Sequence, residues 1–244
     1  MIFTISLAGF AIRVESIHDE VFDMCASYLA PDAEPDFRVA ISPADIAAER
    51  EKARRQDERE GRIPEEYSDA YLETLAVYRQ IAETMPARGV FLMHGSAVAL
   101  GESCWLFTAP SGVGKTTHTK LWLESIEGSY VVNGDKPLIR RREDAFAVCG
   151  TPWSGKEGWN RNTMVPLKGI VFLSRGAENS IVRASAADTL PLLIGQTYRP
   201  MDVGAQKRTL ELLQALCGQV PFYKLTCNME PAAALTAFAG VTQD

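Results

Sequence analysis

The sequence predicts an α/β protein organised around a phosphate-binding loop, and three observations support this class. An apolar stretch at residues 105–108 runs into the segment Ala109-Pro-Ser-Gly-Val-Gly-Lys-Thr-Thr117, and a helical pattern at 115–123 follows it. This segment fits G-x-x-x-x-G-K-[ST], with Ala109 in the place of the first glycine. Elsewhere, short strand-like runs are interspersed with longer helical patterns.

The spacing within this loop has a physical reason. Gly112 and Gly114 have no Cβ, so the backbone can curl and aim successive N–H groups into one concavity. The following helix adds its unpaired N-terminal N–H groups and the positive end of its dipole. Lys115 would reach the β and γ phosphates of a nucleotide, and the Thr116 hydroxyl would ligate Mg²⁺. The alternative is a purely structural strand–turn–helix corner.

Length and composition limit the possible classes. A chain of 244 residues can bury a substantial core as one large domain or two small ones. Its net charge of −6 argues against nucleic acid as the main partner. Five scattered cysteines without metal-ligand spacing predict reduced thiols in a cytoplasmic protein. The apolar start lacks a basic leader and is interrupted by Arg13, so we expect neither a signal peptide nor a membrane span.

Residues 1–66 are expected to form an N-terminal accessory α/β region. Residues 2–15 read as two short strands, and residues 37–41 alternate like a third. Between them, Ser16 is expected to cap an amphipathic helix. Residues 49–66 hold seven acidic and six basic side chains, which favours a solvated helix or mobile connector over a docking surface.

Residues 67–244 are expected to form the domain that carries the phosphate loop. A helix from Ser68 should bury one face, made of Tyr71, Leu75, Tyr78, Ala82 and Met85. Strands are expected at 90–93, 97–100, 104–108, 130–132, 138–141, 145–149, 168–173, 180–183 and 222–226. The runs at 97–100 and 104–108 should pair as a hairpin. Further helices are expected near 186–195, 204–218 and 231–239.

A phosphate loop needs an acid to hold Mg²⁺ or to take a proton from the acceptor. Asp135, just past the apolar strand at 130–132, is the candidate, although Asn-Gly before it is also a hairpin signal. His94 ends a buried-looking strand and could polarise this acid, contact a phosphate, or serve only in packing. His118, about one turn after Lys115, could flank a nucleotide, but we favour a surface role.

The connection at 150–166 is long and rich in Gly, Pro, Asn and Trp, which is typical of functional loops. Lys156 and Arg161 lie in it and could stabilise charge on a γ-phosphate, or could simply be solvated. We favour Lys156. Trp153 and Trp159 could stack on a base or pack the loop. The glycines of this loop predict that it is mobile without ligand.

Four segments together resemble the bacterial HPr serine kinase-like proteins. These segments are His94-Gly-Ser-Ala-Val98, Phe107-Thr-Ala-Pro-Ser-Gly-Val-Gly-Lys-Thr-Thr-His-Thr-Lys-Leu-Trp122, Asn133-Gly-Asp-Lys-Pro137 and Gly150-Thr-Pro-Trp-Ser-Gly155. The family is related to the HPr kinase/phosphorylase catalytic domain and to the phosphoenolpyruvate carboxykinase nucleotide fold. Some of its kinases are encoded beside peptide-modification genes. The resemblance implies a mixed, twisted sheet, ATP with Mg²⁺, and phosphoryl transfer to a serine hydroxyl.

The resemblance also implies roles for individual residues. Asp135 matches the second of two adjacent aspartates that act on the metal and the acceptor hydroxyl, and His94 matches a nearby histidine. Gly134 stands in place of the first aspartate, and the C-terminal HPr kinase signature has no evident match, so the acceptor need not be HPr. Thr116 and Asp135 would hold the metal. The implied phosphate-binding residues are Ser111, Gly112, Val113, Gly114, Lys115, Thr116 and Thr117.

Three functions follow as hypotheses. The first is a small ATP-dependent kinase acting on a hydroxyl of a peptide, protein or small molecule, with Asp135, His94 and Lys156 as catalytic residues. The second is a catalytically weak or inactive nucleotide-binding accessory protein of a peptide-maturation system, which Gly134 keeps open. The third, a metabolic carboxykinase-like enzyme, is disfavoured by the chain's length. Under the first, Gly134→Asp should raise activity unless Gly134 occupies a positive-φ turn, and Asp135 should have a pKa near the ordinary ~4 unless burial raises it.

Overall fold

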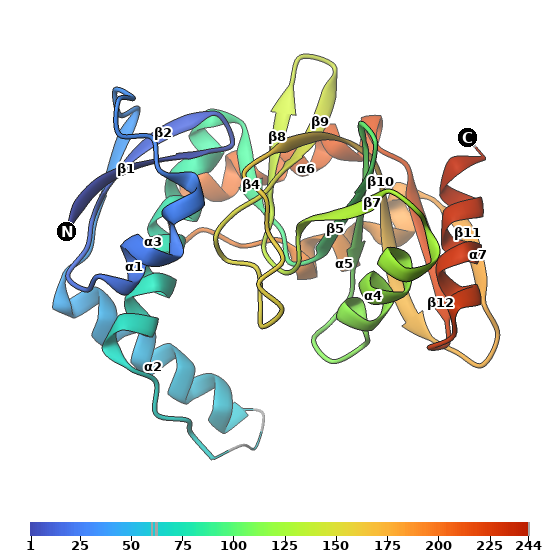
Figure 1. The fold of residues 1–244 in the computed structure, drawn as a ribbon, viewed down its shortest axis with the longest axis horizontal. Helices are drawn as coiled ribbons and strands as arrows, with labels where there is room; N and C mark the ends of the chain where they lie inside the picture. The colour runs from blue at the N-terminus through green and yellow to red at the C-terminus, as the bar shows by residue number, and fades with distance from the viewer. Residues whose placement is uncertain (60, 62, 244) are drawn as a thin grey trace. The chain divides into compact units, whose positions relative to one another are not determined.

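In a computed structural model, the chain forms two compact units, Met1–Thr84 and Met85–Asp244 (Figure 1). The structure describes residues 1–59, 61 and 63–243. The first unit includes helix α3 (Asp69–Thr84), so the chain divides after Thr84, whereas the sequence predicts a division at 66/67. This helix belongs to the first unit because it packs on α1 (Glu20–Met24), α2 (Pro43–Arg59) and β3 (Phe37–Ala40).

The first unit contains a small three-stranded sheet within the described residues. Strands β1 (Ile2–Leu7) and β2 (Phe10–Glu15) pair antiparallel, and β2 pairs parallel with β3. Ala8 and Gly9 join the hairpin with φ of 50° and 74°, as the favoured two-residue hairpin turns require. The expected strands at 2–15 and 37–41 are therefore present.

The helix after β2 does not begin at Ser16. It begins at Glu20 and ends at Met24, and a short 3₁₀ helix at Ala26–Tyr28 follows. Instead of capping, Ser16 Oγ donates to the carbonyl of His18. The fully buried carboxylate of Glu73 on α3 accepts bonds from the backbone N–H groups of Ile17 (2.6 Å) and His18 (2.8 Å). A side chain more than fifty residues away thus satisfies the backbone here, and local capping patterns do not reveal it.

The charged segment largely forms helix α2, and residues 60 and 62 of it lie outside the described residues. The helix is not solvated on every side, because Glu49 is buried and its carboxylate pairs with Arg79. The buried face of α3 also differs from the prediction. Tyr71 is 47% exposed, whereas Leu72 and Val77 are fully buried.

The second unit contains a mixed sheet of nine strands among the described residues. Seven of them lie in the order β4-β8-β9-β10-β6-β5-β7, and β12 pairs with β10 and β11. Their bounds are β4 (Val90–Leu92), β5 (Ser96–Leu100), β6 (Ser103–Thr108), β7 (Ser129–Asn133), β8 (Leu138–Arg142), β9 (Ala145–Cys149), β10 (Met164–Arg175), β11 (Ser180–Ala184) and β12 (Phe222–Cys227). All strands expected in this region are present, and the 97–108 hairpin forms as β5 and β6.

Strand β10 joins the two parts of this sheet. Residues 164–166 pair antiparallel with β9, and residues further along pair parallel with β6 on one side and with β12 on the other. The remaining strand pairs are antiparallel. The carboxyl ends of β6, β10 and β12 therefore lie at one edge of the sheet, which is where open α/β sheets bind ligands.

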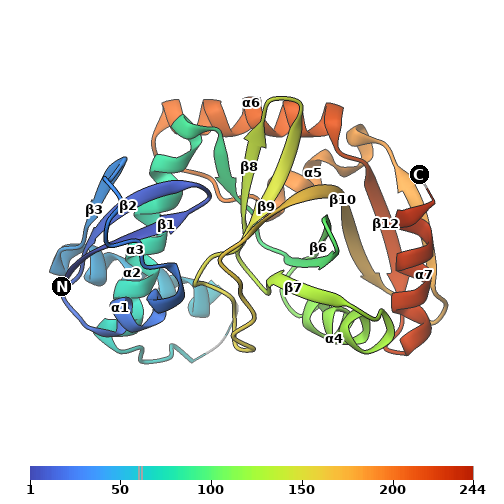
Figure 2. The same ribbon diagram turned by 45° about the horizontal axis from the view of Figure 1, so that its top comes forward.

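Helices cover both faces of this sheet (Figure 2). Helices α4 (Lys115–Ser125) and α7 (Pro231–Thr242) pack on one face, and α5 (Ala186–Gln196) and α6 (Val203–Gln219) pack on the other. Alternation along β6 supplies both cores, because Trp105 and Phe107 face α4 and α7 while Cys104 and Leu106 face α5 and α6. A membrane-crossing helix, judged by length and hydropathy, is not found in the described part of the chain.

Candidate functional site

The loop between β6 and α4 has the backbone conformation that its glycines predict. Gly112 has φ of 78° and Gly114 has φ of 127°, and both values are rare for residues with a Cβ. A Cβ at either position would have open space around it, so φ rather than crowding requires glycine. Gly114 is the N-cap of α4 and gives no side-chain cap. The N–H groups that begin α4 therefore lack a capping side chain, which suits an anionic ligand.

Lys115 folds back over this loop. Its Nζ donates to the carbonyls of Ala109 (2.9 Å) and Pro110 (3.4 Å), and the residue is only 9% exposed. Burial lowers the pKa of Lys115, although the nearby Asp135 carboxylate opposes that shift. The ammonium is thus held by the loop rather than extended into solvent.

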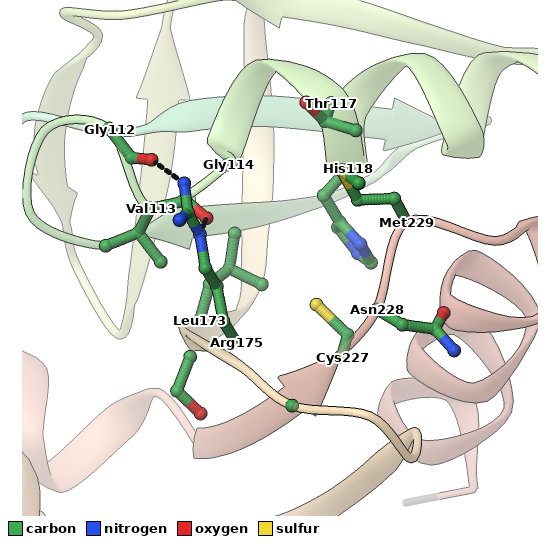
Figure 3. A pocket seen from close by; sticks show the side chains of 12 residues that line it. Gly112, Val113, Gly114, Thr117, His118, Leu173, Arg175, Cys227, Asn228 and Met229 are labelled. Atoms are coloured by element: carbon green, nitrogen blue, oxygen red, sulfur yellow. Dashed lines mark hydrogen bonds between the residues drawn. The ribbon is translucent and has the colours of Figure 1, made fainter.

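Arg175, at the carboxyl end of β10, holds the loop from outside. Its Nε donates to the carbonyl of Val113 at 3.0 Å, and a second guanidinium nitrogen donates to the carbonyl of Gly112 (Figure 3). Arg175 was not among the site residues predicted from sequence. The available signal was a cation directly after an apolar strand, and only the parallel pairing of β10 with β6 places that cation beside the loop.

Asp135 follows β7 in a turn shaped by the buried side chain of Asn133. Asn133 Oδ1 accepts bonds from the backbone N–H groups of Asp135 (2.9 Å) and Lys136 (2.7 Å). The Asn-Gly pair is therefore part of an Asx-type turn, and not a two-residue hairpin connection, because β7 pairs with β5 and not with β8. Asn133 was quoted only as part of a motif, and its shaping of this turn was not foreseen.

The side chains of His94 and Lys136 flank the Asp135 carboxylate. His94 Nε2 lies 3.2 Å from Oδ1, and Lys136 Nζ lies 2.8 Å from Oδ2. Burial raises the pKa of Asp135, but the hydrogen bond from His94 and the charge of Lys136 outweigh it and hold this pKa well below its ordinary value. The expectation of a nearly ordinary pKa, made from the absence of a second carboxylate, overlooked Lys136.

His94 is itself held in place. Its Nδ1 lies 2.9 Å from Gln196 Oε1, its backbone N–H donates to the Gln196 carbonyl, and its own carbonyl accepts a bond from Thr108 Oγ1. Gln196 is the last residue of α5, over one hundred residues away, and sequence reasoning gave no signal for it. The ring is thereby oriented toward Asp135.

One pocket of about 280 Å³ brings several predicted residues together. Thr116, Asp135 and Lys156 line it, with Gly134, Ser154, Gly155, Glu157 and Trp159. His94 reaches it through Asp135. Arg161, the alternative to Lys156, lies elsewhere, with its guanidinium 4.5 Å from the centre of the Tyr130 ring. Trp153 is buried, so it packs the loop.

The loop after β9 is attached to β7 at several points. Asn133 Nδ2 donates to the Thr151 carbonyl (2.9 Å), and Gly134 N–H donates to the Trp159 carbonyl (2.9 Å). Arg161 N–H donates to the Val132 carbonyl at 3.0 Å. The tip between Gly155 and Gly158, which have φ of 78° and 66°, has fewer backbone bonds to β7. These contacts restrict the expected mobility to the tip.

His118 is not on the surface, contrary to the favoured interpretation. It is only 2% exposed, its ring lies 4.8 Å from that of Phe107, and Trp122 Nε1 donates to its Nε2 at 3.1 Å. Burial lowers the pKa of His118 to about 4. The helical spacing had placed this position beside the loop correctly but could not show that Phe107 and Trp122 pack around its ring.

Comparisons with known proteins give only distant similarity, and it is in structure. The sequence matches no protein-family model, and no curated protein matches it. Among solved structures, the fold is similar to that of the HPr(Ser) kinase/phosphatase from Coxiella burnetii, with 9% identity and a TM-score of 0.37. The similarity covers 61% of this chain and 95% of that one. The strand order and the helices on both faces of the sheet make the second unit a mixed α/β fold.

Proposed function

We propose that the protein is an ATP- and Mg²⁺-dependent kinase that transfers a phosphoryl group to a serine-type hydroxyl on a peptide, protein or small molecule. The observation that most supports this is the pocket that Thr116, Asp135 and Lys156 share at the glycine-rich loop. A hydroxyl, a carboxylate and an ammonium at a helix N-terminus are the groups that phosphoryl transfer uses.

The residues present fit a nucleoside triphosphate with Mg²⁺. The uncapped N–H groups of the loop and α4, with the Lys115 ammonium, suit phosphate oxygens. Thr116 and Asp135 offer hard oxygen ligands, and one or two such ligands suffice because Mg²⁺ keeps waters and phosphate oxygens in its shell. When bound, Mg-ATP supplies the phosphoryl group for transfer.

Asp135 would hold the acceptor hydroxyl in line. Its lowered pKa means that the carboxylate is ionised at neutral pH and accepts a hydrogen bond readily. The same shift makes it a weak base, because general-base catalysis is most effective when the pKa lies near the working pH. His94 and Lys136 fix the carboxylate, and Lys156 would stabilise charge on the transferred group. We therefore expect slow turnover, because Asp135 would act mainly by orienting the acceptor hydroxyl and only weakly as a base.

A specific observation favours a second candidate, a nucleotide-binding accessory protein without transfer. A Cβ on Gly134 would lie 2.8 Å from the Ser154 carbonyl oxygen, closer than real Cβ contacts. The loop thus closes over the place where the resembling kinases carry their first aspartate. In this alternative the site binds Mg-ATP and its contacts signal to a partner.

The two candidates are separated by γ-labelled ATP. The full chain is incubated with Mg-ATP and serine-containing peptides, including those encoded nearby in its genome, beside Asp135→Asn and the control Asp144→Asn, an exposed carboxylate outside the site. Label transfer that is lost in Asp135→Asn and kept in Asp144→Asn supports the kinase. Binding of ATP without transfer supports the accessory protein, and absence of binding contradicts both.

A further inference from the structure

A second pocket, of about 420 Å³, lies on the other side of the phosphate loop (Figure 3). Gly112, Val113 and Gly114 form one wall, and the ends of β10 and β12 form the opposite wall. Thr116 lines the first pocket and Thr117 lines this one, so the loop and the first turn of α4 separate the two. The volume falls within the range of about 300–1,000 Å³ typical of small-molecule sites.

His118 lines this pocket, and its ring holds a buried hydrogen-bond donor. Because Trp122 Nε1 donates to His118 Nε2, that nitrogen carries the lone pair, and the proton of the neutral ring is on Nδ1. Burial, which lowers the pKa of His118 to about 4, keeps the ring neutral at pH 7. Within the described part of the chain, Nδ1 has no hydrogen-bond partner. Buried donors without an acceptor are rare in folded proteins and call for a ligand or water.

Asn228 and Arg175, two other polar residues of the pocket, are already bonded. Asn228 Oδ1 accepts a bond from the Glu230 N–H (3.0 Å), and Asn228 Nδ2 donates to the Ala177 carbonyl (3.1 Å). Arg175 donates to the loop carbonyls. Apolar walls remain, from Val113, Leu173, Cys227 and Met229. Figure 3 shows Cys227 pointing toward the space below His118 and the side chain of Met229 lying beside His118.

We propose that this pocket binds the purine base of the nucleotide whose phosphates lie on the loop, and that His118 Nδ1 donates a hydrogen bond to an acceptor atom of that base. The inference rests on the proposed phosphate binding. A purine combines two apolar ring faces with nitrogen or carbonyl acceptors at its edge, which matches apolar walls beside one buried donor. Met229 is 78% exposed and flexible, so its thioether can move to admit the ring.

Binding measurements on the full chain test this directly. Isothermal titration compares Mg-ATP, Mg-UTP and Mg-tripolyphosphate, the last of which carries phosphates without a base. ATP should bind about tenfold or more tightly than tripolyphosphate, and His118→Phe should weaken ATP about 3- to 10-fold while leaving tripolyphosphate unchanged. Thermal unfolding of His118→Phe confirms that the variant is folded.

Alkylation of the unmodified protein provides a second measurement that needs no variant. Cys227 lines the pocket and is half-buried, whereas Cys217 is half-buried on α6 outside it and serves as the internal control. Burial raises the pKa of both thiols, so labelling with N-ethylmaleimide is carried out at alkaline pH. ATP should slow labelling of Cys227 several-fold without affecting Cys217, and tripolyphosphate should affect neither.

The outcomes separate this inference from the proposed function. Equal binding of ATP and tripolyphosphate with unprotected Cys227 overturns the base pocket and leaves the phosphate loop standing. UTP binding as tightly as ATP overturns the choice of a purine. If neither ATP nor tripolyphosphate binds, the proposed function fails and the base pocket fails with it.

Discussion

The positions of several side chains at the site are set by contacts between residues that are far apart in the chain. Asp135 was recognisable from sequence because it follows an apolar strand after a phosphate-type loop. Its neighbours were only partly recognisable, since His94 was proposed but Gln196, which orients it, was not. Periodicity and motif spacing describe a few turns of chain, whereas the pairing of α5 with His94 is set by the whole sheet.

His118 makes stability depend on pH. Its folded-state pKa of about 4 lies below the ordinary histidine value of about 6.5, so the unfolded state binds more protons between these values. Stability is therefore complete above about pH 6.5 and falls by up to about 3 kcal/mol as pH drops toward 4. Asp135, whose pKa is also lowered, adds a loss at still lower pH.

Urea unfolding at a series of pH values measures this effect. His118→Phe, which has no titrating ring, should show a flatter profile between pH 6.5 and 4.5 than the parent. A profile of the same slope in both proteins would mean that other groups cause the acid sensitivity.

Substitutions at Gly134 test how closely the loop after β9 approaches this residue. Gly134 does not have a positive φ, so the anticipated turn strain is absent, and crowding by Ser154 limits it instead. Gly134→Ala and Gly134→Asp should each lower the free energy of unfolding by about 1–3 kcal/mol. The earlier expectation that Gly134→Asp raises activity now requires the loop to shift.

Gly195 on α5 is the matched control, because a Cβ there meets nothing within 4 Å. Gly195→Ala should be neutral or stabilising by about 0.5–1 kcal/mol. Denaturant unfolding curves and ATP binding of the three variants show whether a Cβ at position 134 lowers the free energy of unfolding. Unchanged stability in Gly134→Asp together with faster transfer would restore the original expectation.

At the scale of elements, most strands and helices of the second unit were predictable. Their apolar runs are long and bounded by Gly, Pro or Asn, so each element can be recognised from its local sequence. The predictions were wrong where a residue distant in sequence determines the local structure. At Ser16, for example, the expected capping role is taken by Glu73. The two-sided pairing of β10 was not predictable, because its carboxyl half finds parallel partners in both directions along the chain.

The loop after β9 should respond to ligand only at its tip. The side chain of Asn133 holds Thr151 and Trp153, and backbone bonds to residues 132–134 hold Trp159 and Arg161. Residues 155–157 line the pocket. Hydrogen exchange with and without Mg-ATP should show slowed exchange at 155–158 and little change in the flanks. Slowing spread across the whole of 150–163 would show that the attached segments also open.

At the scale of the whole chain, both pockets described above draw all their lining residues from the second unit. Its two core clusters also contain only residues of that unit. We therefore expect residues 85–243, expressed alone, to fold and to bind Mg-ATP within about threefold of the full chain, a difference smaller than one typical hydrogen bond.

Circular dichroism and isothermal titration on that fragment test this expectation, with the Lys115→Ala fragment as the control for loop-dependent binding. Lys115→Ala should weaken ATP at least about tenfold, since it removes the charge that meets the phosphates. A folded fragment without ATP affinity would assign the first unit a part in binding.

The central position of β10 also bears on the order of folding. Val171 of β10 pairs with Phe107 of β6, and this contact closes a long loop of chain between them. The pairing of β10 with β12 closes a second long loop. Such non-local contacts form slowly, because the entropy of loop closure is lost before they stabilise anything. During synthesis, β6, the glycine loop and α4 emerge well before Arg175, so the newly made loop stays unsupported until β10 docks. Competence to bind phosphate would then be acquired in one late step, and a ligand that binds only the docked loop would stabilise that state and slow its reversal.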